Sequence, residues 1–246
     1  SRHWAHWFAG GKRLLRVPQS HLSTTRFFRH PGDVCGACSG RKSEIKLKDA
    51  AGWAIQADDR MSNKTISLVL GSGGARGLAH VGVIRWLEEH GHQIRSISGC
   101  SIGSFIGGAY ATGTLDAIVD WMENLTKKEI YSMLDLSFSR DSLVKGDRLV
   151  EVIQSKIGTG LIEDLPIKFT AVAADIATEK EHWFQAGPID QAIRASVSLP
   201  LLFTPHTVDG VQLIDGGILN PTPIEPTLGD DTDLTIAVDL GGPMME

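Results

Sequence analysis

The sequence predicts an α/β fold in which a sheet is covered on both faces. Short apolar runs such as Ile66–Leu70 and Phe169–Ala174 have the length and the β-branched content of buried strands. These runs alternate with segments whose apolar residues recur at the helical period, such as Leu78–Glu88. Strands that alternate with helices over about 180 residues are typical of a sheet packed between layers.

The predicted elements follow one another from residue 66. The strand at 66–70 ends at Gly71, and the helix after it ends at His90 and Gly91, which form a helix stop. A second strand at 94–98 leads into a helix of small residues at 102–112, which ends at Gly113. Further helices are predicted at 115–125 and 149–157, and further strands at 169–174, 212–214 and 234–239.

The charge of the chain changes sign near residue 60. Residues 1–60 carry 11 basic and 5 acidic residues, a net charge of +6, whereas the remainder carries 13 and 24, a net charge of −11. The leading segment also lacks a sustained helical or strand period. We therefore expect residues 1–60 to be an appendage of uncertain origin outside the fold, and residues 61–246 to form one domain with Met61 as its natural beginning.

Two features of the leading segment suggest a function of their own. Its first residues fit a basic, aromatic helix on a membrane surface, although Gly10 and Gly11 interrupt it. The residues of that helix are His3, Trp4, Trp7, Phe8, Lys12, Arg13 and Arg16. Cys35 and Cys38 have zinc-ligand spacing, but a structural zinc site usually needs four ligands and there is no second pair. The sequence therefore predicts no metal site.

Composition excludes several classes of protein. No stretch approaches the roughly 20 apolar residues of a membrane-spanning helix. The net charge of −5 gives no general reason to bind nucleic acid. The 3 cysteines are few and odd in number, which argues against a disulfide framework and favours a reducing, cytoplasmic location.

The pentapeptide Gly99–Gly103 fits the pattern G-x-S-x-G between a predicted strand and a predicted helix. A strand that turns sharply into a helix leaves no room for side chains beside the nucleophile, which explains Gly99 and Gly103. Ser101 would present its hydroxyl at a helix N-terminus, where developing negative charge is favoured. A plain tight turn is the alternative, and the strand-to-helix context favours a nucleophile.

A glycine-rich loop, Gly71–Gly77, also joins a strand to a helix. Its spacing does not fit G-x-G-x-x-G and no Gly-Lys-Ser/Thr follows, so dinucleotide and P-loop sites are excluded. Its unhindered amides, beside Arg76, would face the same sheet edge as Ser101 and could stabilise an oxyanion by about 3 kcal/mol per donor. A flexible helix-entry loop is the alternative.

The base that activates Ser101 decides the class of enzyme. A Ser-His-Asp triad would need a late histidine, and only His182 and His206 follow Ser101. Neither stands in a recognisable loop signature. Asp215 ends a short predicted strand and precedes two glycines, so its carboxylate could take the serine proton directly. As an isolated tripeptide, Asp-Gly-Gly is more often a turn.

Four blocks of sequence carry a family resemblance. They are residues 73–82, 99–103, 194–205 and 215–220, and their order and spacing resemble the patatin-like phospholipase family in its small bacterial form, from about Ile66 to the end. The resemblance implies a three-layer α/β/α fold with a mostly parallel central sheet. It also implies a Ser-Asp dyad in place of a triad, with Ser101 as nucleophile and Asp215 as base.

The same resemblance extends to supporting residues and to the substrate. It assigns Gly73, Gly74 and Arg76 to the oxyanion loop, and it makes Gly77, Gly216 and Gly217 supporting parts of the motifs. It implies hydrolysis of lipid or phospholipid esters, transient contact with a membrane surface, and no metal or organic cofactor. The oligomeric state stays open. An esterase with a triad through His206 or His182 is the alternative.

Three features of this sequence affect how its residues compare with the family pattern. Ser72 replaces the first glycine usual in the loop, which could alter the geometry of one amide. The chain ends at Glu246, where family members generally continue with more helix, so we expect either a truncated chain or a reduced lipid-facing cap. His80 follows the family pattern but lies inside the first helix, where packing is the expected role.

Overall fold

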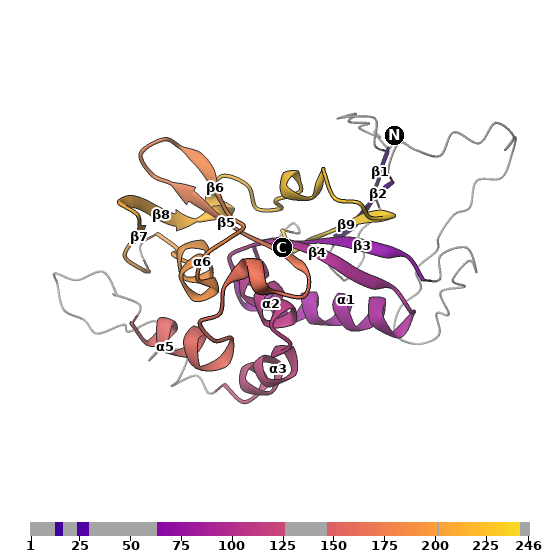
Figure 1. The fold of residues 1–246 in the computed structure, drawn as a ribbon, viewed down its shortest axis with the longest axis horizontal. Helices are drawn as coiled ribbons and strands as arrows, with labels where there is room; N and C mark the ends of the chain where they lie inside the picture. Colours follow the sequence, from indigo (N-terminus) through magenta and orange to yellow (C-terminus); the bar gives the residue numbers. More distant parts are fainter. Residues whose placement is uncertain (1–12, 17–23, 30–62, 126–146, 201, 242–246) are drawn as a thin grey trace, which may run out of the picture.

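The fold is built around one mixed sheet (Figure 1). The computed structural model describes residues 13–16, 24–29, 63–125, 147–200 and 202–241. The strand order is β1-β2-β9-β3-β4-β5-β8-β7, and β6 pairs with β5. The neighbours β9, β3, β4 and β5 are parallel, and the outer pairs are antiparallel. The strands are β1 (Arg13–Arg16), β2 (Thr24–Arg29), β3 (Thr65–Leu70), β4 (Gln93–Cys100), β5 (Lys168–Asp175), β6 (Lys180–Phe184), β7 (His206–Val208), β8 (Val211–Asp215) and β9 (Leu234–Asp239).

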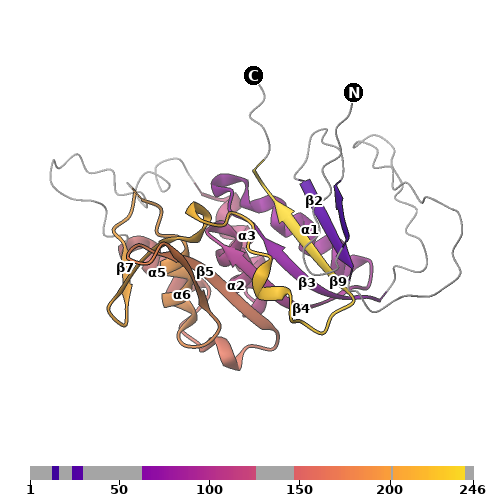
Figure 2. The same cartoon turned by 90° about the horizontal axis from the view of Figure 1, so that it is seen from above.

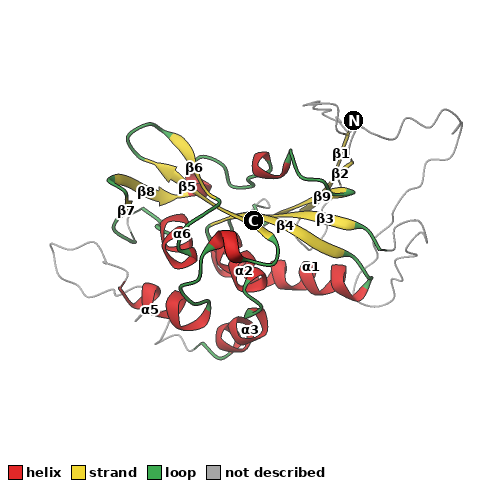
Figure 3. Ribbon diagram, in the orientation of Figure 1, coloured by secondary structure: helices red, strands yellow, loops and turns green. Residues whose placement is uncertain are grey.

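The α-helices in these ranges gather on one face of the sheet (Figure 3). They are α1 (Leu78–Glu89), α2 (Ile102–Ala111), α3 (Leu115–Glu123), α5 (Asp147–Lys156) and α6 (Ile189–Ser196), with short 3₁₀ turns at η2 (Gly74–Gly77), η3 (Ile162–Asp164), η4 (Gly216–Ile218) and η5 (Glu225–Thr227). Alternate residues of the strands, such as Leu68, Ile97 and Phe169, pack with these helices in the main apolar core. The predicted α/β class with a mostly parallel sheet is therefore confirmed.

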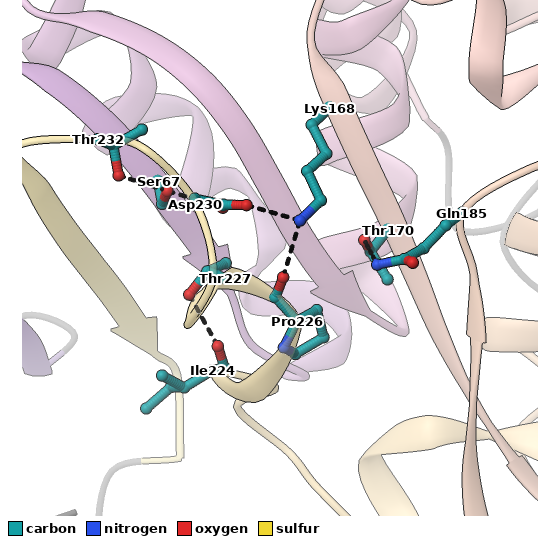
Figure 4. Close-up of polar contacts among 9 residues, drawn as sticks. All are labelled: Ser67, Lys168, Thr170, Gln185, Ile224, Pro226, Thr227, Asp230 and Thr232. Carbon is teal, nitrogen blue, oxygen red and sulfur yellow. Dashed lines mark hydrogen bonds and ion pairs between the residues drawn. The ribbon is translucent and has the colours of Figure 1, made fainter. Parts of the chain in front are cut away.

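The opposite face of the sheet is buried but largely polar. Its side chains include Ser67, Ser98 and Thr170, which alternate along their strands with the apolar core residues. The segment 222–233, which contains η5, covers this face and is joined to the sheet by several polar contacts, including those of Asp230 and Asp233. Asp230 accepts hydrogen bonds from Ser67 at 2.8 Å and from the Lys168 ammonium at 2.6 Å (Figure 4). This segment supplies the third layer, where the described chain has a 3₁₀ turn in place of a long helix.

Two strands of the leading segment extend the sheet. β2 pairs antiparallel with β9, and β1 pairs with β2 beyond it (Figure 2). The sequence did not predict these strands, because residues 1–60 show no sustained strand periodicity. Arg13 and Arg16 lie in β1, not in the membrane-surface helix considered from the sequence. The rest of that helix and the Cys35 and Cys38 pair lie outside the described residues, and the domain division at residue 60 stays a prediction.

No helix in the described ranges combines the length and the apolar character needed to cross a membrane.

Candidate active site

The register of the sheet brings the ends of β4 and β8 together on one edge of β5. Cys100, the last residue of β4, pairs with Val172, and Asp215, the last residue of β8, pairs with Ala173. Because β6 occupies the other edge of β5 at these positions, β4 and β8 must share one edge and meet end to end. Ser101, which follows β4, therefore lies beside Asp215.

Ser101 occupies a sharp turn between β4 and α2. Its backbone has φ 54° and ψ −128°, a conformation that costs a non-glycine residue energy and is common at functional sites. The flanking glycines are required by space. A Cβ on Gly99 would lie 2.6 Å from the Gly103 carbonyl oxygen, and one on Gly103 would lie 2.0 Å from the Leu70 oxygen. The geometry is that expected of a nucleophile elbow.

Asp215 is a buried carboxylate with two hydrogen-bond donors. It is 2% exposed, and its Oδ1 accepts the Gly217 amide at 2.8 Å. Burial raises the pKa of Asp215 above 3.8, while hydrogen bonds from the Ser101 hydroxyl and the Gly217 amide oppose that rise. The Ser101 hydroxyl thus lies close enough to the Asp215 carboxylate to lower its pKa, which is the arrangement that proton transfer between the two groups would need.

The glycine-rich loop is fixed at both ends next to Ser101. The Gly71 amide donates to the Val238 oxygen of β9 at 2.9 Å. At the other end, a Cβ on Gly77 would lie 2.1 Å from Cγ1 of Ile102, so the loop packs directly on the first residue of α2. Gly74 has φ 56°, a backbone conformation that favours glycine.

The amides of Gly73 and Gly74 make no backbone hydrogen bond within the described part of the chain. They are therefore available to an added acceptor. The Arg76 side chain is exposed beside them, and its Nε lies 3.4 Å from the Gly73 oxygen. The loop thus has backbone donors of the kind that an oxyanion needs, and the Arg76 side chain lies on the surface next to them.

The glycines after Asp215 make room for two neighbouring segments. A Cβ on Gly216 would lie 2.3 Å from the Val172 oxygen of β5. A Cβ on Gly217 would lie 2.7 Å from the Ser72 hydroxyl. Ser72, the departure from the family pattern, is therefore accommodated by the missing side chain of Gly217, and its amide donates to the Pro221 oxygen at 2.8 Å.

Two serines that the sequence had given no role hold both site residues. The Ser196 hydroxyl accepts the Ser101 amide at 3.0 Å and donates to the Val172 oxygen at 2.6 Å. The Ser198 carbonyl accepts the Asp215 amide at 2.9 Å. Both serines lie in the block at 194–205, one of the four blocks that carry the family resemblance. The block connects the backbones of Ser101 and Asp215 through the end of α6.

His80 anchors the start of the glycine-rich loop from α1. Its Nε2 lies 2.8 Å from the Gly71 carbonyl oxygen, so this nitrogen carries the proton, and Nδ1 has no partner. Burial lowers the pKa of His80 to about 4, and the hydrogen bond to Gly71 opposes this only in part. The ring is therefore neutral at neutral pH and acts as a structural donor.

Replacing His80 by Gln is expected to flatten the acid dependence of stability. The histidine pKa is 6.5 in the unfolded chain and about 4 in the fold. In the window between these values only the unfolded state binds the proton, so the free energy of unfolding falls as the pH falls, by about 3 kcal/mol over the window. Urea unfolding of both proteins at the two ends of the window measures this.

The exposed His90 provides the matched control for that substitution. His90→Gln should keep the full acid dependence of the wild-type protein. Equal slopes of stability against pH for wild type and His80→Gln would contradict the assignment of this effect to His80.

The histidines considered for a triad have other contacts. His182 lies in β6, on the edge of β5 opposite to Asp215, and its ring packs on Phe184 at 4.5 Å between centroids. His206 lies in β7 with Nε2 2.6 Å from the Gln191 amide oxygen. Burial lowers the pKa of His206, and the charge of Arg194 lowers it further.

Other nucleophiles and ligands near the site are inert or absent among the described residues. Burial raises the pKa of Cys100 far above its usual range, and the charge of Asp215 adds to this, so the thiol stays protonated beside Ser101. The described ranges contain no group of three or more His, Cys, Asp or Glu side chains that could hold a metal.

Comparisons with known proteins agree with the resemblance seen in the four blocks. The family model of patatin-like phospholipases matches residues 68–228. An NTE family protein of Mycobacterium tuberculosis is 46% identical over 181 residues, which cover 74% of this chain and 50% of the relative. A lysophospholipase of Aspergillus fumigatus is 36% identical over 189 residues, which cover 74% of this chain and 12% of the relative.

One solved structure, that of VipD from Legionella pneumophila, matches with 16% identity and a TM-score of 0.39, over 84% of this chain and 49% of that chain. The chain spans about half the length of the mycobacterial relative. The family model covers well over half of the chain and includes the nucleophile elbow, the glycine-rich loop and Asp215. The chain therefore belongs to the patatin-like phospholipase family, a family of lipid ester hydrolases.

Proposed function

We propose that this chain is a serine acyl hydrolase that cleaves carboxylic esters of lipids or phospholipids through a Ser101–Asp215 dyad. The observation that carries the proposal is the position of the strained Ser101 turn beside the buried Asp215 carboxylate, where the ends of β4 and β8 meet. The family match supports the ester hydrolase class. No metal or organic cofactor is needed for the steps below.

The first half of the reaction forms an acyl-enzyme. Ser101 Oγ bonds to the carbonyl carbon of the ester while its proton passes to Asp215. The carbonyl oxygen becomes an oxyanion, which the free amides of Gly73 and Gly74 would stabilise, together with the positive end of the α2 dipole. The tetrahedral intermediate then breaks the ester C–O bond, and the alcohol or lysolipid leaves with the proton from Asp215.

The second half regenerates the enzyme with the same groups. A water molecule gives its proton to Asp215 and bonds to the acyl carbon. Collapse of the second intermediate breaks the bond to Ser101 Oγ, which recovers the proton, and the fatty acid leaves. Asp215 must be ionised for both halves, so its position in a buried but hydrogen-bonded site sets the acid limit of activity.

The substrate class is taken from the family and from a relative. A lysophospholipid is the first substrate to test, because the Aspergillus fumigatus relative is named a lysophospholipase. Phosphatidylcholine and soluble esters complete the comparison between a phospholipase and a simple esterase. The proposal includes a cytoplasmic location, which the small, odd number of cysteines favours.

A labelling and turnover experiment tests the function. A fluorophosphonate, which reacts with activated serines, should label Ser101 as located by mass spectrometry. The protein should hydrolyse p-nitrophenyl esters, lysophosphatidylcholine or phosphatidylcholine, and the folded double variant His182→Ala/His206→Ala should retain turnover within about threefold. Label on another residue, or a loss of more than about 100-fold in the double variant, would overturn the dyad in favour of a triad.

A further inference from the structure

We propose that four exposed apolar side chains around the catalytic residues dock this protein on a phosphatidylcholine bilayer. We call Leu78, Leu199, Ile218 and Leu219 the apolar rim. The inference rests on the proposed function, because a surface that seats the enzyme on a bilayer matters only if the substrate is a lipid held there. It goes beyond that function by naming the docking residues and the kind of surface.

The members of the apolar rim belong to the small set of large hydrophobic side chains that are exposed in the described part of the chain. Leu78 is 39% exposed, Leu199 40%, Ile218 55% and Leu219 43%. Each comes directly after a segment of the site in the sequence. Leu78 follows the glycine-rich loop, Leu199 follows Ser198, and Ile218 and Leu219 follow the glycines after Asp215. Exposed apolar side chains that gather at one place mark a surface meant to be covered.

Contacts across the site place the three segments of the rim together. Gly77, next to Leu78, packs on Ile102 beside the nucleophile. The Asp215 amide donates to Ser198 at 2.9 Å, which brings the backbone next to Leu199 against that of the base. The turn that carries Ile218 faces the glycine-rich loop, since the Ser72 hydroxyl fills the space beside Gly217. The segments that carry the rim therefore all lie next to the Ser101–Asp215 pair.

The segments that carry the apolar rim differ in charge from the rest of the domain. Residues 61–246 carry 24 acidic side chains and a net charge of −11, but the segments 71–78, 199–204 and 216–224 contain no acidic residue. Their single charge is that of the exposed Arg76. Two carboxylates border these segments, since Asn220 donates to Glu181 at 2.9 Å and to Glu225 at 3.0 Å. The rim is therefore an apolar surface with acidic neighbours, which suits a bilayer without net negative charge.

This distribution of charge selects a zwitterionic bilayer as the occupant. Burial of apolar side chains in the headgroup region depends on their area and needs no anionic lipid. The net charge of the full chain, −5, likewise does not favour tighter binding to anionic membranes. The rim should therefore dock through leucine and isoleucine side chains, with little dependence on salt.

Vesicle binding by a catalytically silent protein tests the docking directly. In a Ser101→Ala background, the protein should sediment with phosphatidylcholine vesicles. Addition of Ile218→Ser and Leu219→Ser should lower the partition coefficient at least about tenfold, because two apolar side chains lose their burial in lipid. Leu161→Ser is the matched control: Leu161 is 41% exposed but lies beside η3, before β5 begins, and its replacement should change binding less than about twofold.

The same substitutions in a protein with Ser101 intact distinguish an effect on membrane docking from an effect on catalysis. Ile218→Ser/Leu219→Ser should lower turnover of vesicle phospholipid by the same factor as binding and leave turnover of a soluble p-nitrophenyl ester within about twofold. Loss of both activities together would show that the substitutions damage the site and would overturn the docking role. Binding that rises steeply when phosphatidylserine is added and falls with salt would assign docking to basic residues instead, and would also overturn it.

Failure of the proposed function and failure of the docking give different results. If vesicle binding depends on the rim but the protein hydrolyses no ester, the proposed hydrolase function is wrong and the docking role of the rim stands. Ester turnover with vesicle binding unaffected by the rim substitutions would overturn the docking alone. A change in size-exclusion elution caused by the rim substitutions would assign the rim to self-association between two copies, which also overturns the bilayer.

Discussion

Replacement of Asp215 by Asn is expected to lower ester turnover at least about 10³-fold while the protein remains folded. An amide at this position keeps the shape of the side chain and can still accept the Gly217 amide. It cannot take the Ser101 proton. The loss should appear in kcat for soluble esters and for lipids alike, because the step concerned is the activation of the serine. Steady-state kinetics with a p-nitrophenyl ester measures it.

The same substitution should not lower stability, because burial raises the pKa of Asp215 in the fold. The folded protein holds this proton at pH values where the unfolded chain has lost it, so the site's contribution to stability is present below 3.8 and is lost as the pH rises through the folded pKa. At neutral pH the buried charge is therefore unfavourable, and Asn removes it. A thermal midpoint equal to or above that of wild type is expected.

The exposed Asp164 gives the matched control for the removal of one carboxylate. Asp164→Asn should retain wild-type turnover. In the wild-type protein the acid limb of kcat/KM should lie above 3.8 and stay in place in the His182→Ala/His206→Ala variant. Turnover retained in a folded Asp215→Asn protein would exclude this carboxylate as the base.

Replacement of Gly103 by Ala is expected to destabilise the protein by at least about 3 kcal/mol, or to prevent folding. The added Cβ would lie 2.0 Å from the Leu70 oxygen and 2.9 Å from the Gly71 oxygen. These are backbone atoms of β3 and of the glycine-rich loop, which cannot turn aside as a flexible side chain could. Chemical denaturation, with circular dichroism as the probe, measures the loss.

Gly82 provides the control in the neighbouring helix. It is exposed in α1, and a Cβ there would meet no atom within 4 Å. Gly82→Ala should therefore stabilise the protein by up to about 1 kcal/mol through helix propensity alone. A Gly103→Ala protein as stable as Gly82→Ala would show that the strand-to-helix turn has more space than its geometry indicates.

The parts of the fold that could be predicted are those with local signals. The strands β3 and β4 and the helices α1 and α2 each have an apolar period and a glycine stop, and all were found within two residues of their ends. Helix α6 was missed because it has only 8 residues. Its apolar residues recur at helical spacing, but the stretch is shorter than the window of about 11 residues that such a pattern needs to be recognised.

The candidate site was predicted as far as its residues carry local motifs. The Ser101 elbow and the Asp215 turn were identified from their glycines, but the roles of Ser196 and Ser198 were not. The contact from Ser196 to the Ser101 amide spans 95 positions, and nothing in the local sequence of either residue indicates the other. Positions fixed by long-range backbone contacts can be found only once the sheet register is known.

The placement of β9 beside β3 has a consequence for the timing of assembly. Hydrogen bonds that join the start of β3 to the start of β9 span 168 positions, and the Gly71 amide is held by Val238 at the far end of β9. A nascent chain whose β9 still lies inside the ribosome cannot anchor the glycine-rich loop. Pairing at such separation is also slow. The hydrolase should therefore stay inactive until β9 has emerged from the ribosome.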